Sequence, residues 1–227
     1  MTFTEIPKGT QNWDVNVNAA FVDLQNQTNN NLVTLTNADS ALDARIDVLE
    51  NPVQPFTRFG FVGWNYDPVI GSAVTGPGTD QQLYMLEVQL PNDATVTNVN
   101  LGIGVAGSGF TANRNFVGIY NTAGTLLMGS ADQATTWSSA GLAVSPLSSP
   151  IALAAGTYFV GFMMQATTKP TLLRTSSTAN LGNVLNANQS AEEFRFSTDG
   201  TGLTALPASV NMTTRLALAT AWWVALS

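Results

Sequence analysis

The pattern of apolar and polar positions divides the chain into a helical part and a β part. Between Val17 and Leu49, apolar or small residues recur at intervals of four and three, with one extra interval of four near Asn29-Asn30-Asn31. This spacing is a heptad repeat with a single stutter, which locally unwinds a supercoil. It predicts a coiled-coil helix from about Asn18 to Glu50. The seam positions are Val17, Phe21, Leu24, Thr28, Leu32, Leu35, Asp39, Leu42, Ile46 and Leu49.

A helix of this composition is expected to associate with copies of itself. Its many Asn, Thr and Asp residues have low helix propensity, so it should form only when its seam is buried. Ile46 at an a position with Leu42 and Leu49 at d positions favours two strands, whereas Thr28 and Asp39 leave the number open. The alternative is a helix packed on its own sheets, but so narrow an apolar stripe suits a coiled coil better.

Prolines and glycine mark the predicted boundaries. The first residues include Pro7 and Gly9 and are typical of an extended arm. Asn51-Pro52-Val53-Gln54-Pro55 ends the helix, because two prolines in a short span force extended backbone. We therefore predict an extended arm over residues 1–16, an oligomerising coiled coil over 17–51 and a head domain over 52–227.

From Phe56 onward the hydrophobic period is two, which predicts half-buried strands. Leu86, Val88 and Leu90 alternate with polar residues, and residues 99–105 repeat the pattern. Two further runs, 116–120 and 125–128, flank Asn121-Thr122-Ala123-Gly124, which indicates a four-residue hairpin loop. Residues 157–164 are apolar on both faces, so we expect a central strand there. Residues 174–192, rich in Ser, Thr and Asn, predict a long loop.

The chain closes on a predicted strand, which we expect to be paired inside a sheet. Trp222 and Trp223 fall on opposite faces of it, so we expect one in the core and the other at a subunit interface. Several short strands separated by turn residues indicate an antiparallel sandwich. The predicted fold is mainly β, with an N-terminal α-helical coiled coil followed by a jelly-roll-like β-sandwich.

Composition narrows the classes of function. Only 10% of residues are charged, against roughly 25% in an average soluble domain, so the surface is built from short polar side chains, as in extracellular β-rich assemblies. The net charge of −7 and just two lysines, Lys8 and Lys169, argue against a nucleic-acid partner. Without Cys or His, disulfides, thiolate metal sites and Ser-His or Cys-His nucleophile pairs are excluded. We predict no cofactor and no metal.

The N-terminal residues show no secretory signal, and no run approaches the roughly 20 apolar residues of a membrane span. We therefore expect no membrane insertion. A surface of extracellular type without a signal fits a virion component that is made in the host cytoplasm.

Several stretches resemble segments of minor tail or fibre proteins of phages that infect actinobacteria. Ile6-Pro7-Lys8-Gly9, followed by Asn12-Trp13-Asp14 and Asn18 ahead of a coiled coil, resembles their N-terminal segment. Stretches similar to the strands of their sandwich domains are Asp80-Gln81-Gln82-Leu83 to Leu90-Pro91, Ala94 to Val99, Phe116 to Tyr120 with Gly124, and Ala155 to Gly161. Taken together, these pieces span most of residues 3–164, and it is their order along the chain that supports the resemblance.

The resemblance implies a virion-attached arm, trimeric assembly and a distal head suited to cell-surface contact. Between about Thr167 and Asn211 this sequence departs from the pattern of those phage proteins. The resemblance therefore assigns no binding surface on the head. The arm residues that we expect to anchor the protein to the virion are Ile6, Pro7, Gly9, Trp13 and Asp14.

Two motif matches are better explained structurally. Gly102, Gly104 and Gly107 have the spacing of a dinucleotide-binding loop, but a strand rather than a helix is expected to follow, so they are strand glycines before a turn. Asp14-Val15-Asn16-Val17-Asn18 copies the start of an EF-hand loop, which then fails at Ala19 and Gln25. Asp14 is better explained as a helix cap or an arm contact.

The remaining candidates for chemistry are carboxylates and aromatic side chains. Two carboxylates about 5 to 9 Å apart in a groove could hydrolyse a sugar. Most acids of the head fall in turn-like contexts, which suits solvated loop residues. The acids of the head are Asp67, Asp80, Glu87, Asp93, Asp132, Glu192, Glu193 and Asp199. Trp64, Tyr66 and Trp137 lie outside the alternating runs and are the candidate receptor contacts, because exposed aromatic rings stack on sugars. The alternative is that they plug the ends of the sandwich.

We therefore predict a non-enzymatic structural protein of a phage virion, a homotrimeric minor tail or fibre protein that attaches to the host surface by binding. One alternative is a head fibre or decoration protein of the capsid, and another is a carboxylate-based glycan hydrolase on the tail. The expected partners are copies of the chain, other virion proteins through the arm, and a host cell-surface glycan.

Overall fold

The computed structural model describes residues 13–50, 55–71, 73–177 and 182–227. The chain divides into two compact units, Met1–Val53 and Gln54–Ser227. The boundary falls between Val53 and Gln54, within the proline-containing stretch that the sequence predicts as the end of the helix. The C-terminal unit, which we call the β unit, contains all the strands described.

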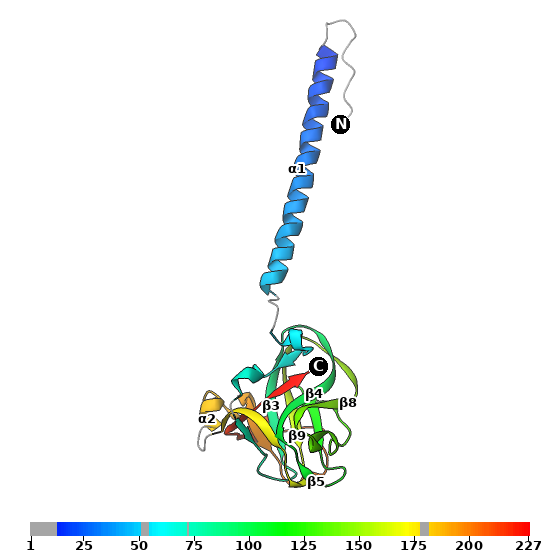
Figure 1. The fold of residues 1–227 in the computed structure, drawn as a ribbon. Helices are drawn as coiled ribbons and strands as arrows, with labels where there is room; N and C mark the ends of the chain where they lie inside the picture. The colour runs from blue at the N-terminus through cyan, green and yellow to red at the C-terminus, as the bar shows by residue number, and fades with distance from the viewer. Residues whose placement is uncertain (1–12, 51–54, 72, 178–181) are drawn as a thin grey trace. The chain divides into compact units, whose positions relative to one another are not determined.

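The first unit contains one long helix, α1 (Trp13–Glu50), coloured blue to cyan in Figure 1. The predicted N-terminal helix is confirmed, and it begins at Trp13, so residues 13–16 are helical rather than part of an extended arm. Along the helix, Thr28, Thr34 and Thr36 donate their hydroxyls to carbonyls four residues earlier, at 2.8–2.9 Å. These bonds satisfy polar groups that otherwise compete with helix formation.

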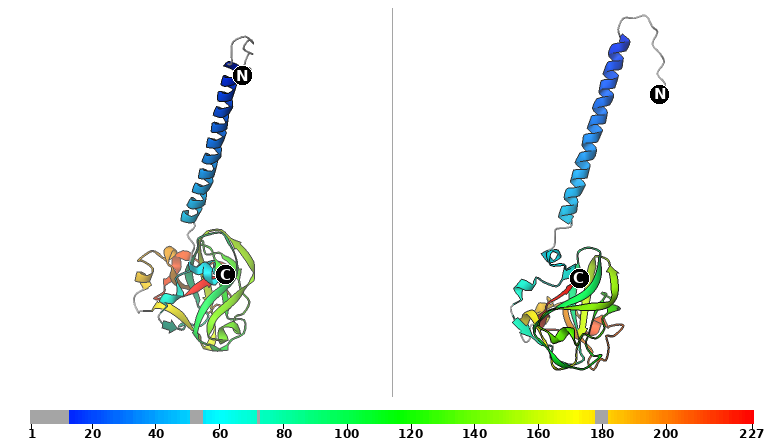
Figure 2. Two further views of the ribbon diagram at one scale, coloured as in Figure 1. Left: turned by 45° about the horizontal axis from the view of Figure 1, so that its top comes forward. Right: turned by 45° about the vertical axis from the view of Figure 1, so that its right-hand side comes forward.

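The β unit is built from antiparallel sheets, as predicted. Within the described residues, the larger sheet has seven strands in the order β1-β15-β4-β11-β14, with β2 paired to β11 and β8 paired to β4. The long strands β4 and β8 lie side by side in Figure 1 and in both views of Figure 2. The strands of this seven-stranded sheet are β1 (Gly63–Trp64), β2 (Ala73–Thr75), β4 (Ala94–Val105), β8 (Gly141–Leu153), β11 (Thr171–Ser177), β14 (Thr220–Trp222) and β15 (Val224–Leu226).

The second sheet has six strands among the described residues, in the order β13-β12-β3-β9-β6-β7. The run predicted to be central, residues 157–164, forms β9, which pairs with β3 on one side and with β6 on the other. Its position explains why it is apolar on both faces. The strands of this six-stranded sheet are β3 (Leu83–Leu90), β6 (Phe116–Tyr120), β7 (Leu126–Gly129), β9 (Gly156–Met163), β12 (Phe196–Asp199) and β13 (Leu216–Ala217).

Short elements complete the β unit. β5 (Ser108–Phe110) and β10 (Ala166–Thr168) form a separate antiparallel pair. Gly102, Gly104 and Gly107 lie in β4 and in the turn before β5, which confirms their structural explanation. The region predicted as a long loop is partly regular, since its first residues belong to β11 and further on it forms a helical turn. The helical turns are η1 (Pro55–Phe59), η2 (Pro68–Ile70), η3 (Thr136–Ser138), α2 (Gly182–Leu185), η4 (Ala191–Glu193) and η5 (Met212–Thr214).

The main hydrophobic core receives side chains from both sheets. Tyr84 of β3 and Phe162 of β9 stack at 5.2 Å between ring centroids. Trp222 of β14, in the other sheet, meets both rings edge to face at 5.1 and 5.6 Å. All three side chains are almost completely buried, so these aromatic contacts join the two sheets directly.

A second core covers the opposite face of the six-stranded sheet. Phe159 of β9 and Tyr120 of β6 pack there against residues of the segment 203–212. Arg215 is also buried, and its guanidinium carbon lies 4.6 Å from the Phe159 ring centroid. Burial lowers the pKa of Arg215 from 12.5 to about 10. Its nitrogens donate to the carbonyls of Ala191 and Glu192, both at 2.8 Å, which compensates the buried charge.

The hairpin predicted at Asn121–Gly124 is confirmed. The Asn121 amide donates to the Thr125 carbonyl at 3.0 Å, and the Asn121 side chain accepts from the Thr125 amide at 2.8 Å. Gly124 has a positive φ of 82°, and a Cβ at this position would lie 2.1 Å from the Val210 carbonyl oxygen. Only glycine fits this turn, because both the backbone conformation and the close approach exclude a side chain.

The last segment of the chain crosses from one sheet to the other. β13 belongs to the six-stranded sheet, whereas β14 and β15 belong to the seven-stranded sheet. β15 lies between β1 and β4, so the expectation of a C-terminal strand inside a sheet is confirmed.

The expectation that only one of Trp222 and Trp223 is buried within the chain is wrong. Each is 2% exposed. Trp222 faces the main core, while Trp223 is covered by Phe61 at 5.7 Å between ring centroids and donates its indole N–H to the Tyr66 carbonyl at 2.9 Å. The segment that leads into β1 and continues past it therefore covers the outer face of the last strands.

Three tyrosines with raised pKa values predict a loss of stability at alkaline pH. Burial raises the pKa of Tyr66, Tyr84 and Tyr120 above the ordinary value of 10.0. Above pH 10.0 the unfolded chain therefore releases tyrosine protons that the folded chain keeps, so the free energy of unfolding should fall as pH rises. The lowered pKa of Arg215 acts in the opposite direction over the same range, because there the folded chain releases a proton that the unfolded chain keeps.

The measurement is urea unfolding at neutral pH and at a series of pH values above 10.0. We expect Tyr120→Phe to have a flatter pH profile than the natural protein, because one of the raised pKa values is removed. An unfolding free energy that rises with pH through this range would contradict the assignment.

Candidate interaction surfaces

The predicted oligomerisation residues lie along α1. The side chains described in this helix, those of residues 17–42, are all exposed. Thr28 is among them, and its hydroxyl bonds the Leu24 carbonyl. Ile46 and Leu49 belong to α1, but their side chains lie outside the described part. The large seam side chains are between half and two-thirds exposed: Val17 52%, Phe21 57%, Leu24 62%, Leu32 63%, Leu35 65% and Leu42 53%.

The predicted anchoring residues are only partly described. Ile6, Pro7 and Gly9 lie outside the described residues. Trp13 and Asp14 form the beginning of α1, although their side chains are not described. Whether these residues contact other virion proteins stays a prediction.

Two of the three candidate receptor contacts, Trp64 and Tyr66, line one cleft. This cleft, which we call the polar cleft, has a volume of about 450 Å³ and combines aromatic with polar side chains. Trp64 and Tyr66 are half-buried, and Gln89 and Arg195 are exposed. Its lining is formed by Phe56, Trp64, Asn65, Tyr66, Glu87, Gln89, Pro91, Arg195 and Phe196.

The segment that carries Trp64 and Tyr66 is fixed by its neighbours in the seven-stranded sheet. Asn65 donates to the Trp222 carbonyl at 2.7 Å and accepts from the Val224 amide at 3.1 Å, so its side chain continues the pairing of β1. The Tyr66 hydroxyl donates to the Ala221 carbonyl at 2.9 Å. Gly63 lets β1 approach β3, since a Cβ there would lie 2.7 Å from the Gln89 carbonyl oxygen. The cleft is therefore built on strands rather than on a free loop.

The prediction of Trp137 as a receptor contact is wrong. Its side chain is 0% exposed. It belongs to η3 and packs into the main core, where its indole N–H donates to the Ser145 hydroxyl of β8 at 3.2 Å. For this residue the structural alternative is correct, because a completely buried ring has no face to offer a ligand.

A second hollow, which we call the apolar groove, lies on the seven-stranded sheet. It has a volume of about 610 Å³. Its lining includes Gly102 and Gly104 of β4, which carry no side chains, and Trp223. The exposed side chains of Phe59, Val69, Val74 and Leu142 also line it. Exposed apolar side chains gathered around one hollow are typical of an interaction surface.

The carboxylates proposed for glycan hydrolysis mostly make structural contacts. Asp67 caps η2 by accepting from the Val69 amide at 2.9 Å. Asp93 accepts from the Ala155 amide at 2.8 Å, and Asp132 accepts from both the backbone and the side-chain amide of Asn115. The Ser190 hydroxyl donates to the Glu192 carboxylate, which lowers the Glu192 pKa. Glu87 differs from these, because it lines the polar cleft.

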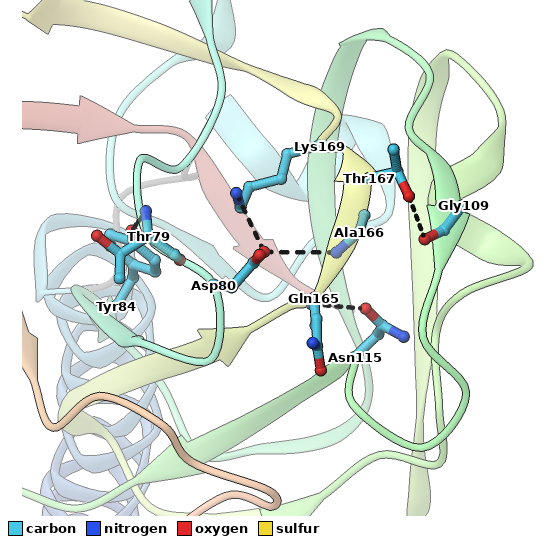
Figure 3. A network of polar contacts seen from close by, with 9 residues as sticks. All are labelled: Thr79, Asp80, Tyr84, Gly109, Asn115, Gln165, Ala166, Thr167 and Lys169. Carbon is cyan, nitrogen blue, oxygen red and sulfur yellow. Dashed lines mark hydrogen bonds and ion pairs between the residues drawn. The ribbon is translucent and has the colours of Figure 1, made fainter.

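Asp80 belongs to a polar network that ties the loop before β3 to the β5–β10 pair (Figure 3). Its carboxylate lies 3.0 Å from Lys169 Nζ and accepts from the Ala166 amide at 3.4 Å. On the other side of the network, Asn115 accepts from the Gln165 amide at 3.0 Å. The network holds both ends of β10 in place. The contacts of Asp80 therefore have a structural role.

In the part of the chain that the structure describes, no three Asp or Glu side chains gather closely enough to hold a metal ion. Neither of the described α-helices has the length and apolar character needed to cross a bilayer.

No protein-family model matches the sequence, and comparison with curated proteins gives no match.

Sequence reasoning missed the polar half of the cleft. The sequence names Glu87 only as one of eight head carboxylates and as a polar position of a strand, treats Gln89 as a polar position alone, and does not single out Arg195. The alternation places Glu87 and Gln89 on one face of the strand, which was a usable signal. Their proximity to Trp64 depends on contacts between distant segments and had no local signal.

Proposed function

We propose that the chain is a structural component of a phage virion, a homotrimeric minor tail or fibre protein that attaches to the host surface by binding without catalysis. In this proposal α1 forms a three-stranded coiled coil, and the β unit is a jelly-roll-like sandwich that forms the head. The residues before α1 attach the trimer to other virion proteins.

The observation that carries the proposal is the exposed seam of α1. Side chains such as Phe21, Leu32 and Leu35 are more than half exposed, and each gains roughly 1.5–3 kcal/mol when it is buried. A 38-residue helix rich in Asn and Thr has little intrinsic stability alone. Burial of the seam between three copies supplies the missing stabilisation and explains the heptad spacing.

In this proposal one coiled coil carries three heads, so every binding site of the β unit is present in three linked copies. Three linked weak binding sites can gain about 10² to 10⁴ in avidity.

Two alternatives remain open to test. A head fibre or decoration protein would have the same architecture but would sit on the capsid. A glycan hydrolase would use Glu87, which lines a cleft, together with a second carboxylate. The first alternative changes the position on the particle, and the second would release new reducing ends from an envelope polysaccharide.

The test is labelling of intact phage particles with an antibody raised against residues 54–227. We expect label at the tail of each particle, and its absence from purified particles would contradict the proposal. Label confined to the capsid would support the first alternative. Incubation of the protein with host envelope polysaccharide should release no reducing ends, and robust turnover would favour the hydrolase.

A further inference from the structure

We propose that the polar cleft binds neutral hexose units of a glycan, with the sugar face against Trp64 and the sugar hydroxyls on Glu87 and Gln89. This inference rests on the proposed attachment function and names its ligand class and site. Three features of the cleft carry it: an aromatic wall, a pair of hydrogen-bonding side chains on one strand, and a balanced charge.

The aromatic wall is formed by Trp64 and Phe56. Their rings meet edge to face at 5.6 Å between centroids, with an interplanar angle of 74°. Phe56 is buried and Trp64 is half-buried, so the indole is supported from within the fold while part of it stays accessible. One face of a pyranose ring consists of C–H groups, which pack well on an aromatic surface.

The polar side is formed by Glu87 and Gln89, which project from the same face of β3. Gln89 Nε2 lies 3.4 Å from Glu87 Oε1, so the two side chains already face each other. A carboxylate accepts hydrogen bonds from two hydroxyls, and an amide both donates and accepts. Such a pair suits adjacent hydroxyl groups of a sugar, which also donate and accept.

Arg195 adds a fixed donor at the same cleft. Its Nη2 donates to the Leu185 carbonyl at 2.5 Å, and its Cζ lies 5.9 Å from the Phe196 ring centroid. A guanidinium has five N–H donors, so donors remain for a ligand after this bond is made. Because its position is set by existing contacts, little further ordering is needed when a ligand binds.

The charge of the cleft favours a neutral ligand. Glu87 and Arg195 balance each other among the lining residues, and the whole chain carries a net charge of −7. A negatively charged glycan would therefore be repelled by the protein as a whole. The cleft volume of about 450 Å³ falls within the range of small-ligand sites, roughly 300–1,000 Å³.

The test uses the full-length protein and an array of immobilised oligosaccharides. The array carries neutral glucose, galactose and mannose oligosaccharides, and sulfated or uronic-acid oligosaccharides for comparison. The strongest neutral binder is then titrated in solution. We expect Trp64→Ala and Glu87→Gln each to weaken binding by about tenfold or more, since each removes a central contact of the site.

Matched control variants change similar side chains outside the cleft. Leu142→Ala removes an exposed apolar side chain of the apolar groove, and Glu193→Gln neutralises an exposed carboxylate that does not line the cleft. Both should keep the natural affinity. Because Trp64 also contacts Phe59 and Phe61, thermal unfolding is followed for every variant, and Glu87→Gln decides the question if Trp64→Ala does not fold.

The inference is overturned if no neutral oligosaccharide binds, if only acidic ones bind, or if folded cleft variants keep full affinity. Its failure is distinguishable from failure of the proposed function. A trimeric protein present on particles that binds no neutral oligosaccharide overturns the cleft assignment alone. A monomeric protein absent from particles that binds through Trp64 and Glu87 overturns the fibre function alone.

Discussion

Replacing Leu32 and Leu35 together with aspartate should convert the full-length protein from a trimer to a monomer. These side chains are 63% and 65% exposed on the isolated helix, and in a trimer six leucines would leave water. At roughly 1.5–3 kcal/mol each, their burial is a large share of what holds three chains together. Aspartate at these positions would instead gather six carboxylates in the seam, where like charges repel.

Sedimentation equilibrium measures the outcome directly. The natural protein should have three times the 24.0 kDa mass of one chain, and the double variant should have the mass of a single chain. If α1 is stabilised by association, as we propose, circular dichroism should also show a loss of helix.

The matched control replaces Val22 and Val33 with aspartate. Both valines are exposed on the same helix, at 55% and 60%, but each directly follows a seam position, Phe21 or Leu32, rather than occupying one. This variant adds the same charge at positions predicted to face outward, so the trimer should persist. A natural protein that sediments as a stable monomer, or a control that dissociates as readily as the seam variant, would contradict the coiled coil.

The sequence predicted the strands best where one face is buried and the other is not. In β3, Leu86, Val88 and Leu90 are buried while Gln89 is exposed. Apolar and polar residue types therefore alternate with the same period of two as burial. β6 was predicted with its observed bounds for a related reason, because turn residues follow it closely. Such features are local, and local sequence is sufficient to specify them.

Predictions about aromatic residues failed where burial depends on distant segments. Trp137 lies among Ser and Thr residues, yet it is buried because β8 supplies its partner, Ser145. Trp223 is buried because residues near Phe61 and Tyr66, more than a hundred positions earlier, cover it. Neither partner can be identified from the residues around the tryptophan, since the pairing is set by the topology of the sheets.

In the polar cleft, too, local features could be predicted from the sequence and contacts between distant segments could not. Trp64 and Tyr66 were identified from the sequence because they lie outside the alternating runs. Glu87 and Arg195 come from β3 and from the residue before β12, and the fold brings them to the cleft through strand pairing, with the Glu87 amide bonded to the Arg195 carbonyl at 2.8 Å. A site assembled from several strands is therefore visible only after the register is known.

Removing residues 224–227 should leave the β unit unable to fold. Val224, Ala225 and Leu226 are completely buried, and β15 joins β1 to β4. Loss of the strand would expose the main core and leave the backbone amides of Asn65 and Val62 and the side-chain oxygen of Asn65 without their partners. Burial of Val224 and Leu226 alone is worth roughly 3–6 kcal/mol, which approaches the 5–15 kcal/mol stability of a typical domain. Loss of the cooperative unfolding transition, followed by near-ultraviolet circular dichroism, is the expected result.

A matched pair of leucine substitutions separates the packing of β15 from any general effect of shortening the chain. Leu226→Ala creates a cavity in the main core, where the side chain is 0% exposed, so it should lower the free energy of unfolding by about 2–5 kcal/mol. Leu216→Ala changes the same residue type in β13, where the side chain is 67% exposed, and should cost less than about 0.5 kcal/mol. Urea unfolding of both variants measures the difference. Equal losses would contradict the assignment of β15 to the core, because the Leu226 side chain is buried and the Leu216 side chain is exposed.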